Sequence, residues 1–188
     1  MTTTKKGQFF LFPPPELNEY LMLISPSDEI KKDIKKMKTK LYKIIEKPSE
    51  NQYPVAHILL FKTKWEKDIH VIQKLKKSLV DQKSFEIGIN EADVFSHGAK
   101  KKTLCLKIEN PKPIQDLFEA VSKEFKVKND LNPYLTIEQN ILIADFEKIQ
   151  QDLSAFNYQN KWTCDRVTIL KKHKIKGTYK VIEEILFQ

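Results

Sequence analysis

One histidine of this chain lies in a sequence pattern that is typical of a strand with chemistry on one face. Residues 53–61 form a short apolar run that contains His57. Successive side chains of a strand point to opposite faces, so we expect His57, Leu59 and Phe61 to share one face. Histidine is the side chain whose ordinary pKa lies near neutrality, which suits proton transfer to or from a substrate. A plainer explanation is a histidine at the edge of the core whose ring bonds a backbone carbonyl.

A second run, residues 131–137, repeats this plan with Tyr134 and Thr136 on one face. Their hydroxyl groups can hydrogen-bond phosphate oxygens, although threonine is also common in strands for structural reasons. Each run is followed within about ten residues by an amphipathic helix pattern. The sequence therefore predicts two strand-then-helix units that face each other, with His57 opposite Tyr134 and Thr136.

These two runs resemble the paired motifs of the two-histidine phosphoesterase superfamily, which includes 2′-5′ RNA ligase-like proteins and cyclic nucleotide phosphodiesterases. That family has two His-x-Ser/Thr motifs on strands that line a cleft between two pseudo-symmetric lobes. The first motif is His-Ile-Leu at 57–59 here, so the hydroxyl is lost, and the second is Tyr-Leu-Thr at 134–136, so the histidine is lost. The resemblance covers residues 17–188.

The resemblance implies that His57 is a catalytic general acid or base and that Thr136 and Tyr134 bind the phosphate of a 2′,3′-cyclic or 2′-5′ phosphodiester. A phenol with a pKa near 10 keeps its proton at pH 7, so Tyr134 can donate a hydrogen bond but is a poor base. Losing an acid or base partner typically costs about 10² to 10⁴ in rate. Losing the hydroxyl at Leu59 removes a charge-assisted hydrogen bond of roughly 1.5 to 3 kcal/mol. We therefore expect weak or lost catalysis, unless His97, His173 or a lysine replaces the missing histidine.

Hydrophobic periodicity predicts an α+β fold of two similar lobes, each an antiparallel sheet backed by helices, with a central cleft. A helix starting near Ser25 has an apolar stripe at steps of three and four, and Ser25 and Asp28 suggest a capping box. Gly98 marks the turn of a hairpin. The other expected helices and strands have these ranges: helices Ile69–Leu79, Pro113–Phe125 and Phe146–Phe156; strands Glu19–Ile24, Phe85–Ile89, Leu104–Ile108, Trp162–Leu170 and Tyr179–Phe187.

The length of 188 residues suits one domain, which we divide into an irregular arm at residues 1–16 and a single bilobal domain at residues 17–188. No apolar run approaches the roughly 20 residues of a membrane helix, so we expect no membrane partner. The two cysteines lack the spacing of a metal or redox site, and we expect free thiols in the cytoplasm. We expect a monomer that needs no cofactor and no metal.

The net charge of +8 favours partners that carry phosphate. The lysines of residues 31–47 form the polar face of the first helix, where they either attract an acidic polymer or simply keep the face solvated. The basic segment 97–102 is either a hairpin tip or a loop that touches a phosphate. Arg166, the single arginine, either clamps a phosphate with its two-pronged guanidinium or makes a surface ion pair.

Three functions remain open at this point. The first is a divergent phosphoesterase that acts on a 2′,3′-cyclic or 2′-5′ phosphodiester of RNA or a nucleotide. The second is a non-catalytic module that binds RNA or a nucleotide in the same cleft, and the third is a scaffold whose interaction surface lies elsewhere. Turnover separates the first from the second, and ligand binding separates both from the third.

Overall fold

A computed structural model describes residues 16–47, 55–173 and 177–188. The predicted N-terminal arm, apart from Glu16, and the predicted loop at 48–52 lie outside the described residues. Eight strands form two four-stranded antiparallel sheets, which confirms the predicted α+β fold. Sheet A has the order β2 (Ile58–Trp65), β1 (Asn18–Ile24), β7 (Arg166–Lys172) and β8 (Tyr179–Leu186). Sheet B has the order β5 (Tyr134–Leu142), β4 (Lys101–Ile108), β3 (Phe85–His97) and β6 (Asn160–Cys164).

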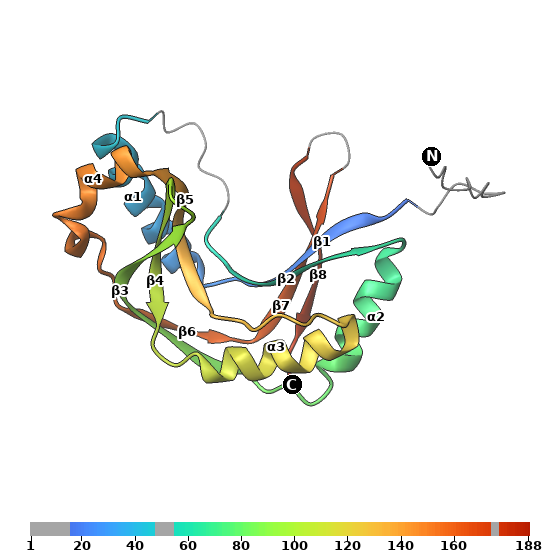
Figure 1. Cartoon of the computed structure of the whole chain (residues 1–188). Coiled ribbons are helices and arrows are strands. Elements are labelled where there is room, and N and C mark those ends of the chain that lie inside the picture. Colours follow the sequence, from blue (N-terminus) through green and yellow to red (C-terminus); the bar gives the residue numbers. More distant parts are fainter. Residues whose placement is uncertain (1–15, 48–54, 174–176) are drawn as a thin grey trace, which may run out of the picture.

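Two helices cross from the sheet that precedes them to the opposite sheet. The four α-helices are α1 (Asp28–Ile44), α2 (Asp68–Ser78), α3 (Lys112–Phe125) and α4 (Ile143–Gln150). Helix α1 follows β1 of sheet A but packs against β5 of sheet B, and α3 follows β4 of sheet B but packs against β2 of sheet A (Figure 1). Each lobe is therefore covered in part by a helix from the other half of the fold. Among the described residues, no helix has the length and apolar character needed to cross a membrane.

The start of α1 differs by two residues from the predicted capping box. Ser27, not Ser25, is the N-cap, and its hydroxyl accepts a hydrogen bond from the amide of Ile30 at 3.4 Å. Asp28 and Glu29 follow in the first turn, where negative charge is favourable beside the positive end of the helix dipole. The prediction was wrong because Ser27 already supplies the acceptor directly before the first helical residue.

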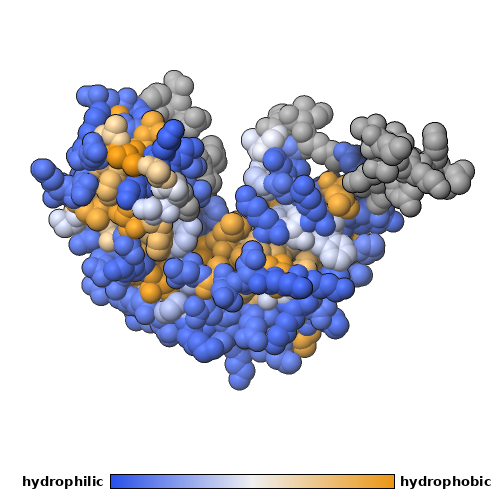
Figure 2. All heavy atoms as spheres, viewed as in Figure 1, coloured by the Kyte–Doolittle hydropathy of each residue, from blue (hydrophilic) through white to orange (hydrophobic). Residues whose placement is uncertain are grey.

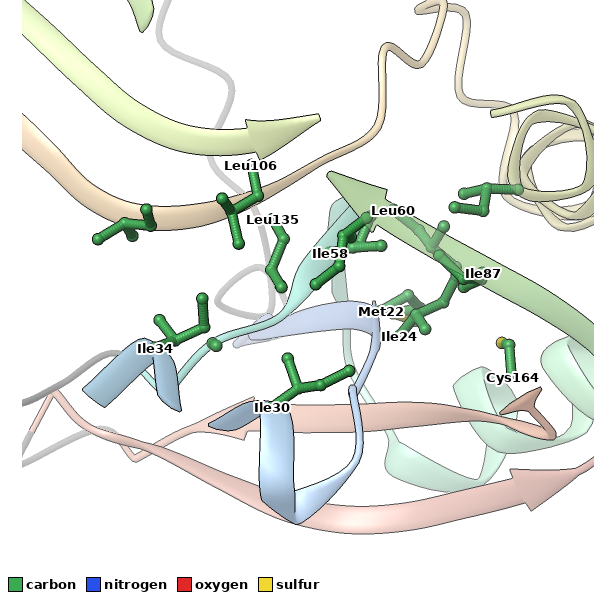
Figure 3. Packing of buried hydrophobic residues seen from close by; sticks show 14 of the residues in the cluster. Met22, Ile24, Ile30, Ile34, Ile58, Leu60, Ile87, Leu106, Leu135 and Cys164 are labelled. Carbon is green, nitrogen blue, oxygen red and sulfur yellow. The ribbon is translucent and has the colours of Figure 1, made fainter. Parts of the chain in front are cut away.

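The core is continuous between the two lobes. Figure 3 shows side chains from α1, sheet A and sheet B packed together, and all of those labelled belong to one cluster of buried residues: Met22, Ile24, Ile30, Ile34, Ile58, Leu60, Ile87, Leu106, Leu135 and Cys164. Cys105 and Cys164 are both free, as predicted, and both are buried. Burial raises the pKa of each thiol to about 12, so both are inert at neutral pH.

The predicted alternation along β2 fails at Phe61. Met22 lies opposite Phe61 but Leu23 lies opposite Leu59, so Leu60 is an extra residue in β2. Such a bulge shifts all following side chains to the other face. Phe61 consequently faces α3, where it packs against two phenylalanine rings at centroid distances of 5.2 and 6.3 Å. Leu59 keeps the open face and is only half-buried.

The predicted strand Trp162–Leu170 is in fact two strands in different sheets. Strand β6 pairs with β3 of sheet B, whereas β7 pairs with β1 and β8 of sheet A. The break falls at Asp165, whose carbonyl accepts a hydrogen bond from the amide of Phe187 at 2.7 Å. The chain changes sheets at this residue. The apolar alternation shifts by one position there, from Trp162 and Cys164 to Val167, and this shift was the available signal.

Candidate functional site

The two strands that carry the motif residues lie next to each other. Strand β2 is the edge of sheet A, strand β5 is the edge of sheet B, and Cα atoms of the two strands approach within 8 Å. On β5, Tyr134 and Thr136 are half-buried, whereas Leu135 and Ile137 between them are fully buried. The predicted alternation is confirmed for this strand. The fold thus brings the first motif segment and the second motif strand together, although they are distant in sequence.

A hollow separates the two lobes on the open side of the sheets. Figure 2 shows apolar atoms on its floor, mixed apolar and hydrophilic atoms on the lobe drawn at left, and mostly hydrophilic atoms on the lobe drawn at right. The helix-covered face of β1 carries Met22 and belongs to the main core. The opposite face carries Leu21 and Leu23, which are buried but lie outside that core cluster, and Leu59 is paired with Leu23. We take this second face as the sheet A wall of the cleft.

His57 precedes β2 by one residue, and its half-buried ring has one nitrogen fixed by the backbone. The Nδ1 atom lies 2.7 Å from the carbonyl oxygen of Val55. Because a carbonyl oxygen only accepts hydrogen bonds, Nδ1 must carry the proton. In the neutral ring, Nε2 then has the lone pair that can take a proton from a substrate or water. The backbone contact expected of a structural histidine therefore also determines which ring nitrogen is available to accept a proton.

The surroundings of His57 favour its neutral form. Burial is the largest cause that lowers the pKa of the imidazole, and the positive charges of Lys38 and Lys62 lower it further. The hydrogen bond to the Val55 carbonyl raises the pKa but does not outweigh these effects. At neutral pH, His57 can therefore accept a proton but has none to donate from Nε2.

A buried polar cluster connects α1 to β5 near His57. The side chain of Lys38 is 5% exposed, and its Nζ lies 3.8 Å from Oε2 of Glu138. The Tyr42 hydroxyl donates a hydrogen bond to the same oxygen at 2.6 Å. Burial lowers the pKa of Lys38 and raises that of Tyr42. Sequence reasoning missed this cluster, although Lys38 lies four residues after Ile34 in the apolar stripe of α1, and this spacing was the available signal.

Tyr134 stands where the family motif has its second histidine, and an aromatic neighbour holds it. Its ring lies 5.0 Å from the ring of Phe95 on β3, in a tilted arrangement that aromatic pairs favour. Strand β4 lies between β3 and β5, since its residue Cys105 is paired with Asp93 of β3 and with Thr136 of β5. The rings of Phe95 and Tyr134 therefore meet above β4. Burial raises the pKa of Tyr134, so its phenol stays protonated and acts as a hydrogen-bond donor at neutral pH.

Arg166 lies at the start of β7 and is engaged by two carboxylates. Its Nε and Nη2 donate to Asp165 at 2.8 and 3.0 Å, and its Nη1 donates to Glu184 at 3.3 Å. These carboxylates raise the pKa of the guanidinium. Of the two roles considered for Arg166, a surface ion pair is the one that these contacts match. A phosphate at Arg166 would have to compete with the two carboxylates.

The other histidines are dispersed. His70 is exposed on α2, and His173 lies in the turn between β7 and β8, where its backbone amide donates to Thr178. His97 ends β3, but its side chain lies outside the described part of the structure. Within the described residues, no group of three or more His, Cys, Asp or Glu side chains has an arrangement that could hold a metal ion.

We predict that an NMR titration gives His57 a pKa below the ordinary value of 6.5 and shows the Nδ1–H tautomer in the neutral ring. The unfolded chain then binds more protons than the folded chain between these two pKa values, so stability must rise with pH through that window. The stabilisation is complete above the unfolded pKa and is lost as the pH falls towards the folded pKa.

The variant His57→Gln should lack this part of the pH dependence in urea denaturation. His70→Gln is the matched control, because His70 is exposed on α2. A His57 pKa at or above 6.5, or a neutral ring protonated at Nε2, would contradict the arrangement described above.

Comparisons with known proteins agree with this geometry. The family model of the 2′-5′ RNA ligase superfamily matches residues 26–176, which include both motif segments. Apo LigT of E. coli superposes with a TM-score of 0.61 at 12% identity, over 92% of this chain and 99% of that chain. TT0787 of Thermus thermophilus gives 0.62 at 12% identity, over 90% and 97% respectively. Usb1 of Kluyveromyces marxianus gives 0.53 at 9% identity, over 88% and 97%.

No curated protein sequence matches the chain. These solved structures are all of low identity, so they show a shared fold, whereas the family model spans most of the sequence. Two lobes with antiparallel sheets, and two motif strands side by side between them, are what the resemblance of the two sequence runs implied. The chain belongs to the 2′-5′ RNA ligase superfamily.

Proposed function

We propose that this protein binds a 2′,3′-cyclic or 2′-5′ phosphodiester of RNA or a nucleotide in the cleft between β2 and β5, and that it hydrolyses this ligand weakly or not at all. One observation carries the proposal: the motif strands are adjacent edge strands, with Tyr134 and Thr136 on the half-buried side of β5 and Nε2 of His57 unclaimed by the Val55 carbonyl. This arrangement supports a single site that combines a proton acceptor with hydroxyl donors.

Each side chain has a distinct role in this proposal. Thr136 and Tyr134 donate hydrogen bonds to phosphate oxygens, because both carry a hydroxyl proton at neutral pH. His57 faces the attacking oxygen and accepts its proton through Nε2. Arg166 is a further phosphate ligand in this proposal, reached when the phosphate replaces Glu184 as the partner of Nη1.

The same environment limits turnover. Burial keeps His57 without a second proton and keeps Tyr134 protonated, so the base and the donor cannot readily exchange roles between turnovers. The phenol is also a weaker acid than an imidazolium for protonating the leaving oxygen. Leu59 offers no hydroxyl where the family motif has one, so one hydrogen bond to phosphate is absent.

Relatives support the ligand class. Structures of E. coli LigT are known with 3′-AMP and with ATP bound. The net charge of +8 also attracts phosphates over a distance. The two free, buried thiols suit a reducing compartment, which supports a cytoplasmic protein.

The second candidate is a purely non-catalytic binding module with the same ligand. The replacement of a histidine by Tyr134, and the packing of that ring on Phe95, favour it, because an aromatic pair stabilises a binding surface without supplying a base. The two candidates share every contact with the phosphate and differ only in turnover.

We predict that Thr136→Val weakens binding of 2′,3′-cyclic AMP by about 10- to 150-fold, which corresponds to roughly 1.5 to 3 kcal/mol for a hydrogen bond to a charged group. Isothermal titration calorimetry measures this loss. Thr163→Val is the matched control, since Thr163 is an exposed residue of β6. Equal affinities of Thr136→Val and the unchanged protein would exclude Thr136 from the phosphate site.

We also predict that the double variant Tyr134→His, Leu59→Thr, which restores both motifs, raises turnover of 2′,3′-cyclic AMP by about 10² to 10⁴. Product formation over time measures the gain. Adding His57→Gln to this double variant should remove it. A restored protein that binds the nucleotide but gains no turnover would show that the reacting atoms do not lie between β2 and β5.

A further inference from the structure

A groove lined by lysines lies directly beside the segment that holds His57. It has a volume of about 160 Å³ and is formed by one side of α1 and the two residues before His57. We call it the α1 groove, and it is lined by Lys31, Lys32, Ile34, Lys35, Lys38, Val55 and Ala56. The lysine face of α1 thus contains a hollow, which the sequence did not reveal.

The α1 groove contains two lysines that pair with no carboxylate among the described residues. Lys31 pairs with Asp28 at 3.1 Å, and Lys38 lies 3.8 Å from Glu138. Lys32 and Lys35 are exposed, and within the described residues no carboxylate lies within ion-pair distance of either ammonium group. Two uncompensated cations on the rim favour an anionic ligand.

The floor of the groove is apolar, and this restricts the chemical class of ligand that the groove would favour. Ile34 is buried beneath it, and Val55 remains 49% exposed. A free inorganic anion gains nothing from apolar contacts. A nucleotide does, because its phosphate pairs with lysine while its base or sugar covers an apolar surface.

Two residues of the groove also act on His57 of the proposed phosphodiester site. The Val55 carbonyl fixes Nδ1 of His57, and the Val55 side chain lines the groove. Lys38 lines the groove as well, and its charge lowers the pKa of His57. The groove therefore begins at the segment that holds His57, and a ligand strand that extends beyond the phosphate at His57 could enter it.

We infer that the α1 groove binds the phosphate of a nucleotide next to the one held at His57, through Lys32 and Lys35, so that the ligand is an RNA strand and not a mononucleotide. This inference rests on the proposed function and adds the substrate class. A solvated helix face accounts for lysines on a convex surface, but not for an apolar hollow that adjoins His57.

The experiment compares two ligands and two charge-reversal variants. The ligands are a single-stranded RNA about ten nucleotides long that ends in a 2′,3′-cyclic phosphate, a length within the usual site size of single-strand binders, and 2′,3′-cyclic AMP. The variant K32E/K35E changes the groove, and K83E/K128E makes the same charge change on the loops that precede β3 and follow α3, outside the groove. Thermal melting confirms that all three proteins are folded to the same extent.

We expect K32E/K35E to bind the RNA at least about tenfold more weakly, with a slope of log affinity against log salt that is shallower by about 0.7, because the contact with one phosphate of a single strand is lost. Binding of 2′,3′-cyclic AMP should stay within about twofold, because the lost contacts serve a phosphate that this ligand lacks. The control K83E/K128E should leave both affinities similarly unchanged.

If K32E/K35E leaves RNA binding unchanged while 2′,3′-cyclic AMP still binds, the groove inference fails and the proposed function stands. If K32E/K35E and K83E/K128E weaken RNA binding equally, the effect is general charge attraction, and the groove inference again fails. If the unchanged protein binds neither ligand, both the proposed function and the groove inference fail.

Discussion

The exchange of helices between the two halves of the chain is the constraint on which the site depends. Helix α3 covers sheet A, where its phenylalanines pack on Phe61, and α1 covers sheet B, where Leu41 and Tyr42 are buried. Truncating one such buried phenylalanine typically costs about 3 to 5 kcal/mol, which is a large part of the roughly 5 to 15 kcal/mol of net stability that a domain usually has. The edge strands β2 and β5 are thereby held side by side, and the cleft follows from the way the core is built.

Burial determines the protonation states of the two titratable side chains in this cleft, His57 and Tyr134. Removing water from His57 and from Tyr134 favours the uncharged form of each, which leaves one proton acceptor and one proton donor that do not interchange. The Val55 carbonyl decides which imidazole nitrogen is available, and the buried Lys38, held near Glu138, reinforces the neutral imidazole. These protonation states are the basis of the proposal that the site binds a phosphodiester and turns it over slowly or not at all.

The parts of the fold that could be predicted from the sequence are those that depend on neighbouring residues alone, such as strand alternation and tight turns. The alternation around Tyr134 and Thr136 and the hairpin turn at Gly98, where φ is +64°, followed from strand periodicity and from glycine's tolerance of positive φ. Tertiary packing decided the rest. The bulge at Leu60 turns Phe61 towards α3, the sheet change at Asp165 needs a second sheet, and the Lys38 cluster needs β5. The spacing of apolar residues carries two signals of these features: Lys38 lies within an apolar stripe, and the alternation shifts by one position between Cys164 and Val167.

The most direct test of the account is a crystal structure of this protein with 2′,3′-cyclic AMP at saturating concentration. The account predicts phosphate oxygens within about 2.7 to 3.2 Å of the hydroxyl groups of Thr136 and Tyr134, with a water molecule between the phosphorus and Nε2 of His57. Nucleotide density elsewhere on the protein, with side chains closing the space between β2 and β5, would contradict it.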